Sequence, residues 1–400
     1  MREGEGLFTD LYELTMCQAY FNEGLEQDAV FDLYVRSLPP QRNFLIACGL
    51  DQVLSYLEAL SFDQAALEYL RSRGLFSEPF LEYLSTLRFT GSVRAVPEGT
   101  AVFAGEPILE VTAPIPQAQI VETYLLNQVT FQTIIASKGA RAVIAARGRT
   151  LVDFGSRRAH GSDAALKAAR ALYIAGYDST SNVLAGREYG IPVAGTMAHS
   201  YIEAHESEVE AFRAFLRSYP ETVLLVDTYD TMEGLRRVAA LAAEQGGLRI
   251  RGVRLDSGDM GALAKAARQV LDDAGLRAAG IFGSGGMDEY EIDALLSAGA
   301  PFTAFGVGTA ATVSSDAPAL DSAYKLVAFA GRPRMKLSPE KATLPGPKQV
   351  FRRLEHGRFA GDVIALASES LPGEPLMVEV MHAGRRTAAG ASSLEEARAR

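Results

Sequence analysis

The sequence has few cysteines, no excess of basic charge and no long apolar run. Its two cysteines, Cys17 and Cys48, stand apart and lack the spacing of a metal site, which favours a reducing compartment. The formal net charge of −10 argues against nucleic acid as the main partner, because binding to a phosphate backbone requires a basic face. No apolar run approaches the ~18 residues that a membrane span requires, and the first residues lack the apolar core of a signal peptide. We therefore expect a cytoplasmic protein without a membrane or nucleic-acid partner.

Two motifs of common functional classes are also missing. The sequence contains no glycine-rich loop that ends in Gly-Lys-Ser/Thr, and this absence disfavours ordinary P-loop ATPase chemistry. Residues 91–116 alternate apolar and polar positions between turn signals, as in the β-sandwich modules that carry biotin or lipoate on a turn lysine. This stretch has no lysine, so we expect a structural β-sandwich-like module rather than a carrier.

The pattern changes along the 400 residues, which are enough for two or three domains. Residues 1–118 combine helical stretches with strand-like ones and predict an N-terminal α/β domain that includes the β-module. Residues 119–324 alternate strand and helix patterns, and residues 325–400 form a C-terminal segment. Residues 332–353 are basic in an otherwise acidic chain, either as a solvated linker with a small β-domain or as a positive rim to an anion site. The basic residues concerned are Arg332, Arg334, Lys336, Lys341, Lys348, Arg352 and Arg353.

The region 119–324 repeats a strand–helix unit after a long helical stretch at 120–148. Helical patterns lie between the apolar strand candidates, at a spacing close to one βα unit each time. Seven such units with buried parallel strands predict a TIM-like α/β barrel that is irregular or incompletely closed, with a doubly wound sheet as the alternative. The strand candidates are 151–154, a short strand near Tyr177, 192–195, 223–226, 252–255, 280–282 and 303–305.

Charged, hydroxyl and glycine residues follow every one of these strand candidates. Barrel and open α/β enzymes place their active sites at the carboxyl ends of consecutive strands, so we expect an active site at this edge of the sheet. None of the loops contains a lysine, which disfavours a barrel lyase or aldolase with a catalytic lysine. The loops are 153–158, 176–181, 195–199, 227–231, 254–259, 283–286 and 306–309.

The stretch 195–205, with the sequence GTMAHSYIEAH, contains the most informative of these loops. Its Gly-Thr pair lets a ligand approach closely, and His199 lies at an expected helix start, where unsatisfied N–H groups favour anions. His199 could contact phosphate, act as a general base or accept a phosphoryl group, and the alternative is a simple helix cap. Glu203 follows at the spacing of helical metal ligands, but no third ligand is evident, so we do not expect a transition-metal site.

The last two loops are rich in glycine, which allows backbone amides to converge on phosphate oxygens. The dinucleotide fingerprint that 306–311 also matches is weak, because it comes at the end of the repeat. The expected phosphate-binding residues are Ser284, Gly285, Gly286, Gly306, Gly308 and Thr309.

Arginines and carboxylates also follow the strand candidates at the edge of the sheet where we expect the active site. Arg157, Arg158 and Arg254 suggest bidentate recognition of carboxylate or phosphate, with structural salt bridges as the alternative. Asp256 and Asp259 could hold ribose hydroxyls or a Mg²⁺ that bridges a diphosphate, and Asp259 could instead cap a helix. These residues predict an enzyme that handles a phosphorylated sugar and an anionic co-substrate.

Several motifs, in this order, resemble those of the nicotinate phosphoribosyltransferase family. The likeness extends over nearly the whole chain and includes 335–338 and 345–350 near its C-terminal end. The motifs are TDLYELTM (9–16), DFGSRRA (153–159), SNVLAG (181–186), GTMAHS (195–200), VRLDSGD (253–259) and FGVGT (305–309).

The resemblance implies a type II phosphoribosyltransferase fold, in which an N-terminal α/β domain, completed by the C-terminal segment, packs on an irregular α/β barrel. It also implies a homodimer with active sites shared between subunits. The implied reaction joins nicotinate to phosphoribosyl diphosphate and gives nicotinate mononucleotide and diphosphate, with coupled ATP hydrolysis and Mg²⁺.

The resemblance also assigns roles to residues. His199 matches the histidine that ATP phosphorylates, and Asp256 is the second expected catalytic residue and, with Asp259, an expected metal ligand. Met197 and Ser200 stand where many relatives have Gln and Glu, which leaves the strictness of ATP coupling open. The alternatives are a nicotinamide or quinolinate phosphoribosyltransferase and a non-catalytic ligand sensor. The expected substrate-binding residues are Tyr12 (donated across the dimer), Phe154, Arg157, Thr196 and Arg254.

Overall fold

The computed structural model describes residues 5–245, 249–338 and 342–400. The chain divides into two compact units. The first combines the chain up to Ile134 with Ala319–Arg400, and the second is the continuous segment Ile135–Pro318.

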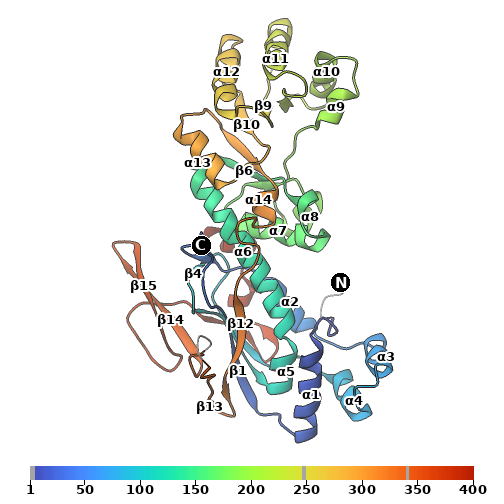
Figure 1. Cartoon of the computed structure of the whole chain (residues 1–400), viewed down its shortest axis with the longest axis vertical. Helices are drawn as coiled ribbons and strands as arrows, with labels where there is room; N and C mark the ends of the chain where they lie inside the picture. The colour runs from blue at the N-terminus through green and yellow to red at the C-terminus, as the bar shows by residue number, and fades with distance from the viewer. Residues whose placement is uncertain (1–4, 246–248, 339–341) are drawn as a thin grey trace. The chain divides into compact units, whose positions relative to one another are not determined.

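The first unit is built on an antiparallel sheet that takes strands from distant parts of the chain. Its seven strands have the order β13-β12-β1-β5-β3-β17-β18. Figure 1 shows β12 next to its partner β1. Leu33 in β1 is paired with Leu109 on one side and with Tyr324 on the other, and all three side chains are buried. The strands are β1 (Asp28–Val35), β3 (Ser92–Ala95), β5 (Pro107–Pro114), β12 (Ser322–Phe329), β13 (Arg332–Pro333), β17 (Val378–His382) and β18 (Arg385–Arg386).

The strands expected within 91–116 are present, but they do not form a sandwich of their own. β3 and β5 belong to the seven-stranded sheet, because β5 pairs with β1 as well as with β3. The remaining strand, β4 (Ala101–Val102), pairs with β2 (Leu45–Ile46). Alternation along the chain therefore indicated the strands correctly, whereas their partners lie far away in sequence.

Short helices complete the first unit. Helix α1 (Leu11–Glu23) begins after Asp10 and ends at Gly24, whose φ of 66° is the left-handed conformation that stops a helix. Its Leu14 and Cys17 are buried. The other helices are α2 (Leu50–Ala59), α3 (Gln64–Ser72), α4 (Glu78–Thr86), α5 (Ile115–Ile120), the 3₁₀ turn η2 (Ala389–Ala391) and α15 (Leu394–Ala399).

The basic segment 332–353 divides into exposed and buried parts. Arg332 and Arg334 are exposed, and Lys341 lies outside the described residues. Lys348 and Arg352 instead belong to β14, where they are buried in ion pairs with Asp32 (2.6 Å) and Asp362 (2.5 Å). For these two residues neither the linker nor the anion rim applies, because each cation is neutralised inside the first unit. β14 (Lys348–Glu355) lies between β15 (Arg358–Leu366) and β16 (Glu374–Pro375) in a three-stranded sheet.

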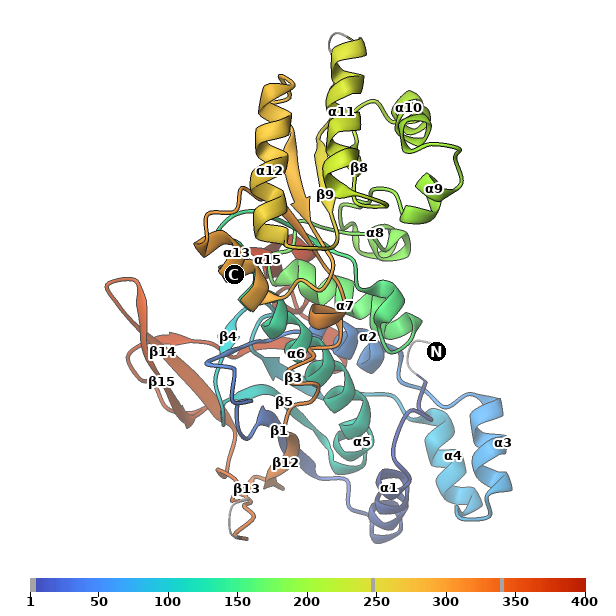
Figure 2. The ribbon, with the colours of Figure 1, turned by 45° about the horizontal axis from the view of Figure 1, so that its top comes forward.

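The second unit contains the predicted parallel sheet. Its six strands have the order β7-β6-β11-β10-β9-β8, so that the last strand, β11, pairs with the first, β6. Helices α11 and α12 pack along the strands, as apolar parallel strands require (Figure 2). The strands are β6 (Thr150–Asp153), β7 (Ser179–Thr180), β8 (Val223–Leu225), β9 (Gly252–Leu255), β10 (Gly280–Gly283) and β11 (Ala304–Val307). The helical elements are α6 (Glu122–Ala146, which starts in the first unit), η1 (Ser156–Arg158), α7 (Ser162–Ile174), α8 (Val183–Tyr189), α9 (His199–Glu203), α10 (Glu208–Ser218), α11 (Thr231–Gln245), α12 (Met260–Asp273), α13 (Glu289–Ser297) and α14 (Thr309–Thr312).

One expected strand is reduced to a single bridge. In 192–195, Val193 pairs in parallel with Thr180 of β7, and no ladder to β8 is formed in the part of the chain that the structure describes. Pro192 lacks the N–H that a strand ladder needs. The second unit is therefore an α/β unit with a parallel sheet, and its closure into a barrel is not shown.

No helix among the described residues is long and apolar enough to cross a membrane.

Candidate active site

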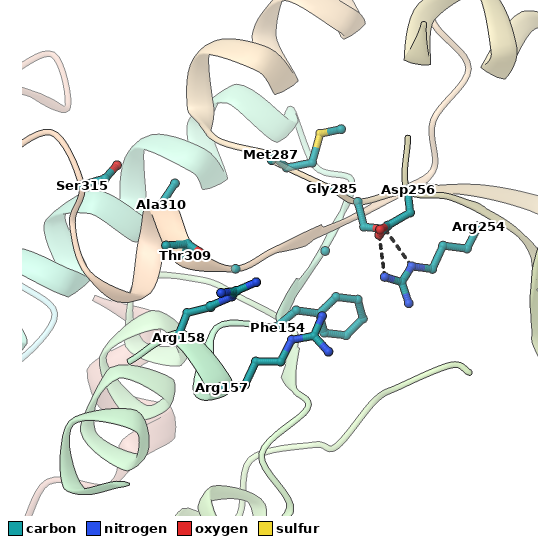
Figure 3. Close-up of a pocket in the computed structure, with 14 residues that line it drawn as sticks. Phe154, Arg157, Arg158, Arg254, Asp256, Gly285, Met287, Thr309, Ala310 and Ser315 are labelled. Carbon is teal, nitrogen blue, oxygen red and sulfur yellow. Dashed lines mark hydrogen bonds and ion pairs between the residues drawn. The ribbon is translucent and has the colours of Figure 1, made fainter. Parts of the chain in front are cut away.

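The polar loops of the second unit meet at one pocket of about 440 Å³ (Figure 3). The pocket joins the end of β6, the end of β9 and the two glycine-rich loops after β10 and β11. Eleven of the residues predicted from sequence line it, which is the expected outcome when parallel strands end at one edge. The lining residues are Phe154, Arg157, Arg158, Arg254, Asp256, Ser284, Gly285, Gly286, Met287, Gly306, Gly308, Thr309, Ala310 and Ser315.

The Arg254 side chain contacts several other residues around the pocket. Its guanidinium donates to Asp256 Oδ1 (2.6 Å), Ser284 Oγ (2.7 Å) and Thr196 Oγ1 (3.0 Å), and it lies 5.3 Å from the centre of the Phe154 ring. Burial alone would raise the pKa of Asp256, but hydrogen bonds from Ser284 and Arg254 hold it below its ordinary value. Arg254 and Asp256 are therefore a charged pair in fixed orientation, with Thr196 at its edge.

His199 lies beside this pair, at the first residue of α9 as expected. Its Nδ1 is 3.1 Å from Thr228 Oγ1, and its Nε2 faces Asp256 Oδ2 at 3.9 Å. The side chain is 41 % exposed, so a ligand can reach the ring.

The structure adds two residues that sequence reasoning did not single out. Thr228 contacts the His199 ring, and Asp227 accepts hydrogen bonds from Asp256 N–H and Ser257 Oγ, both at 2.8 Å. The other carboxylate oxygen of Asp227 is buried, and no hydrogen-bond donor contacts it within the described part of the chain. Both residues begin the polar loop 227–231, so the sequence indicated the loop but not these two positions within it.

Glycine is required by close packing in both glycine-rich loops, which are the expected phosphate-binding loops. Gly285 has a φ of +80°, and a Cβ there would lie 1.8 Å from the carbonyl oxygen of Asp256. Gly306 lies under the ring of Phe154, which a Cβ would approach to 2.4 Å. The loops can therefore come this close to β6 and β9 only with glycine at these positions.

A buried carboxyl group holds the turn that bears the two exposed arginines. Asp153, at the end of β6, accepts from the Gly155 N–H (2.8 Å) and from Thr180 Oγ1 (2.7 Å). Burial raises the pKa of Asp153, and these hydrogen bonds oppose that rise. Arg157 and Arg158, in η1, form no ion pair within the described part of the chain and point to the pocket (Figure 3). They are the cations best able to meet an incoming anion.

Two predicted residues lie elsewhere. Asp259 caps α12 by accepting from the Ala262 N–H (3.0 Å), as the helix-cap alternative expected, and its metal role stays a prediction. Tyr12 belongs to α1 in the first unit and is 47 % exposed. Burial and the neighbouring Glu122 raise the pKa of Tyr12. No cluster of three or more His, Cys, Asp or Glu side chains suited to a metal ion occurs among the residues described.

These features define a class of enzyme. Two glycine-rich loops line the pocket, two arginines face it, and a histidine stands beside a carboxylate at the carboxyl edge of a parallel sheet. Such an arrangement is typical of an α/β enzyme that acts on a phosphorylated sugar.

Comparison with known proteins narrows the class. The nicotinate phosphoribosyltransferase (NAPRTase) N-terminal domain matches residues 7–130, and the nicotinate phosphoribosyltransferase (NAPRTase) family matches residues 149–339. A nicotinate phosphoribosyltransferase of Mycobacterium tuberculosis is 55 % identical over 393 residues, which cover 98 % of this chain and 85 % of that protein. The enzyme of Bacillus subtilis is 42 % identical over 376 residues, covering 91 % of this chain and 77 % of that protein.

A solved structure supports the same family assignment. The crystal structure of human nicotinic acid phosphoribosyltransferase has a TM-score of 0.87 and 31 % identity, and the match covers 98 % of this chain and 92 % of the human one. The chain belongs to the nicotinate phosphoribosyltransferase family.

Proposed function

We propose that this pocket joins nicotinate to phosphoribosyl diphosphate and releases nicotinate mononucleotide and diphosphate, a step of NAD biosynthesis and salvage. The observation that carries the proposal is the single pocket in which Arg254 and Phe154 stand beside two glycine-rich phosphate loops. One half of the pocket suits a flat anionic ring, and the other half suits phosphates.

The residues suggest how the two substrates lie. The nicotinate ring packs against Phe154, and its carboxylate meets Arg254 and the Thr196 hydroxyl, which are already 3.0 Å apart. Loop amides of 284–286 and 306–309, with Arg157 and Arg158, hold the phosphates. The ring nitrogen then attacks the ribosyl carbon while the bond from that carbon to the diphosphate oxygen breaks, and diphosphate leaves with the electron pair. The protein contributes orientation and charge compensation to this step.

His199 is the proposed site of coupling to ATP. Its Nε2 attacks the terminal phosphorus of ATP, ADP leaves, and the phosphohistidine is later hydrolysed. Thr228 at Nδ1 keeps Nε2 directed toward the pocket side, where Asp256 lies 3.9 Å away. A phosphoryl group there adds negative charge next to Asp256 and reorganises the loops that hold diphosphate.

Mg²⁺ fits this donor set only in part. Asp256 already bonds Arg254 and Ser284, whereas Asp227 has a buried oxygen without a donor among the described residues. Mg²⁺ is commonly held by one or two carboxylates together with substrate phosphates, so Asp256, with Asp227 or Asp259, would hold it when substrate is bound. The ion would supply charge neutralisation for the diphosphate.

The proposal has two architectural parts. The second unit is an irregular TIM-like barrel, a proposal supported by a cavity of about 520 Å³ lined by residues of all six strands and of 192–196. The enzyme is a homodimer in which the exposed Tyr12 of one subunit stacks on the nicotinate bound by the other.

The test measures mononucleotide formed from phosphoribosyl diphosphate and Mg²⁺ with nicotinate, nicotinamide or quinolinate, each with and without ATP. We expect product from nicotinate, increased by ATP, and we expect His199→Asn to abolish the increase while basal product remains. Full ATP stimulation in His199→Asn would contradict the phosphohistidine. Product only from nicotinamide or quinolinate would overturn the role of Arg254, and no product with any base would favour a ligand sensor.

A further inference from the structure

A buried lysine joins the segments that follow the two phosphate loops. Lys138 lies on α6, and its side chain is 3 % exposed. Its ammonium group is 2.7 Å from Glu289 Oε2 and 2.9 Å from Asp316 Oδ1. The Glu289 and Asp316 side chains are 5 % and 18 % exposed, so the group is almost entirely removed from water.

Each of the two carboxylates lies a few residues after one of the two glycine-rich loops. Glu289 is the first residue of α13, and it follows the loop of Ser284 to Met287 after a single residue. Asp316 directly follows Ser315, which ends the short turn that begins with α14 at Thr309. Met287 and Ser315 both line the pocket (Figure 3). The ammonium group of Lys138 therefore binds both segments that follow the phosphate loops.

The charge balance of this group is well defined. Arg141 also donates to Glu289 Oε1 at 2.9 Å, so that two cations meet two carboxylates. Burial alone would raise the pKa of Glu289, but hydrogen bonds from Lys138 and Arg141 hold it below its ordinary value. A buried ion pair adds little stability over apolar residues of the same volume, and its best-attested benefit is a fixed geometry.

We propose that Lys138 is a positioning residue that sets the spacing between the two phosphate-binding loops. The inference rests on the proposed function, because it assigns those loops to phosphoribosyl diphosphate. Lys138 touches no substrate, and it acts by holding α13 and the turn after α14 against α6. Without its charge, the ion pairs of Lys138 with Asp316 and Glu289 are lost, the two segments that follow the loops move apart, and phosphates are held less well.

The test compares Lys138→Met, Lys138→Arg and Asp316→Asn with the wild-type enzyme. The readouts are the dissociation constant for phosphoribosyl diphosphate by calorimetry, the KM values for both substrates, and thermal unfolding. We expect Lys138→Met to weaken phosphoribosyl diphosphate binding about tenfold, since small displacements of binding groups have effects of this size, with the KM for nicotinate within about twofold. Lys138→Arg should recover most of the affinity, and Asp316→Asn should lose affinity without general unfolding.

The matched control is Arg237→Met. Arg237 pairs with the buried Glu208 at 2.6 Å in the same unit, but neither residue follows a phosphate loop. Its loss should lower thermal stability and leave phosphoribosyl diphosphate binding unchanged. If Lys138→Met and Asp316→Asn bind phosphoribosyl diphosphate like the wild type, or if Arg237→Met weakens it as much, the positioning role is wrong. If Lys138→Met does not fold, Asp316→Asn decides alone, and a wild-type enzyme that does not bind phosphoribosyl diphosphate refutes the proposed function itself.

Discussion

Replacing Arg254 by lysine tests the centre of the pocket while keeping its charge. The guanidinium donates to three side chains at 2.6, 2.7 and 3.0 Å, and the side chain is 13 % exposed. A lysine ammonium can keep the bond to Asp256, but it cannot also span Ser284 and Thr196. A hydrogen bond to a charged group contributes about 1.5 to 3 kcal/mol. Because water can replace part of the two lost bonds, we expect a net loss of about 2 to 3 kcal/mol, or roughly 30- to 150-fold in kcat/KM for nicotinate.

Steady-state kinetics with each substrate varied in turn measure this loss. The effect should fall on kcat/KM for nicotinate, with a smaller effect on the KM for phosphoribosyl diphosphate, because the phosphate loops keep their own amides. Arg236→Lys, at an exposed pair with Glu233 on α11, is the matched control and should change neither value. Nicotinate kinetics within twofold of wild type in Arg254→Lys would refute the reasoning, as would an equal loss for both substrates.

Three further predictions follow from the packing around the pocket and from one buried acid. Gly285→Ala should nearly abolish activity and lower the melting temperature, because the added Cβ would lie 1.8 Å from the Asp256 carbonyl oxygen at a positive φ; wild-type activity would contradict that geometry. Thr228→Val should reduce ATP stimulation several-fold and leave the basal reaction unchanged, since it removes the partner of His199 Nδ1; unchanged stimulation in a paired assay with and without ATP would exclude the contact. Burial raises the pKa of Glu13 to about 7, so the folded state keeps a proton that the unfolded state releases near its ordinary pKa of 4.5. This group's contribution to stability falls as pH rises from about 4.5 to 7, and Glu13→Gln should flatten that slope in urea unfolding measured at pH 5 and pH 8, whereas parallel slopes would contradict it.

The pocket could be predicted because its residues follow the strands of a strand–helix unit that repeats along the sequence. Glycines, arginines and hydroxyls such as Gly285, Arg254 and Thr309 follow apolar strands, and parallel strands bring their ends to one edge. The positions of most strands and of α9 were predictable for the same reason.

Partners that are distant in sequence could not be predicted. Lys348 was expected in a linker or an anion rim, yet it pairs with Asp32, which lies more than 300 residues earlier in the chain. Nothing local distinguishes the supporting acid Asp227 from other loop carboxylates, because its role depends on the backbone of Asp256 in the next strand loop. The strand at 192–195 is reduced because Pro192 has no N–H to donate. This loss matters only where the N–H side of the strand faces another strand, and that depends on the tertiary fold.

The seven-stranded sheet of the first unit has a consequence for synthesis of the protein on the ribosome. β1, β3 and β5 are made early, but their neighbours β12 and β17 appear only after the whole second unit has been translated. The second unit is continuous and can fold as soon as residue 318 has left the exit tunnel, whereas the edges of β1 and β3 must wait. During that interval the unpaired edges are open to association with other nascent chains, so slow translation of the last 80 or so residues would increase the need for a chaperone.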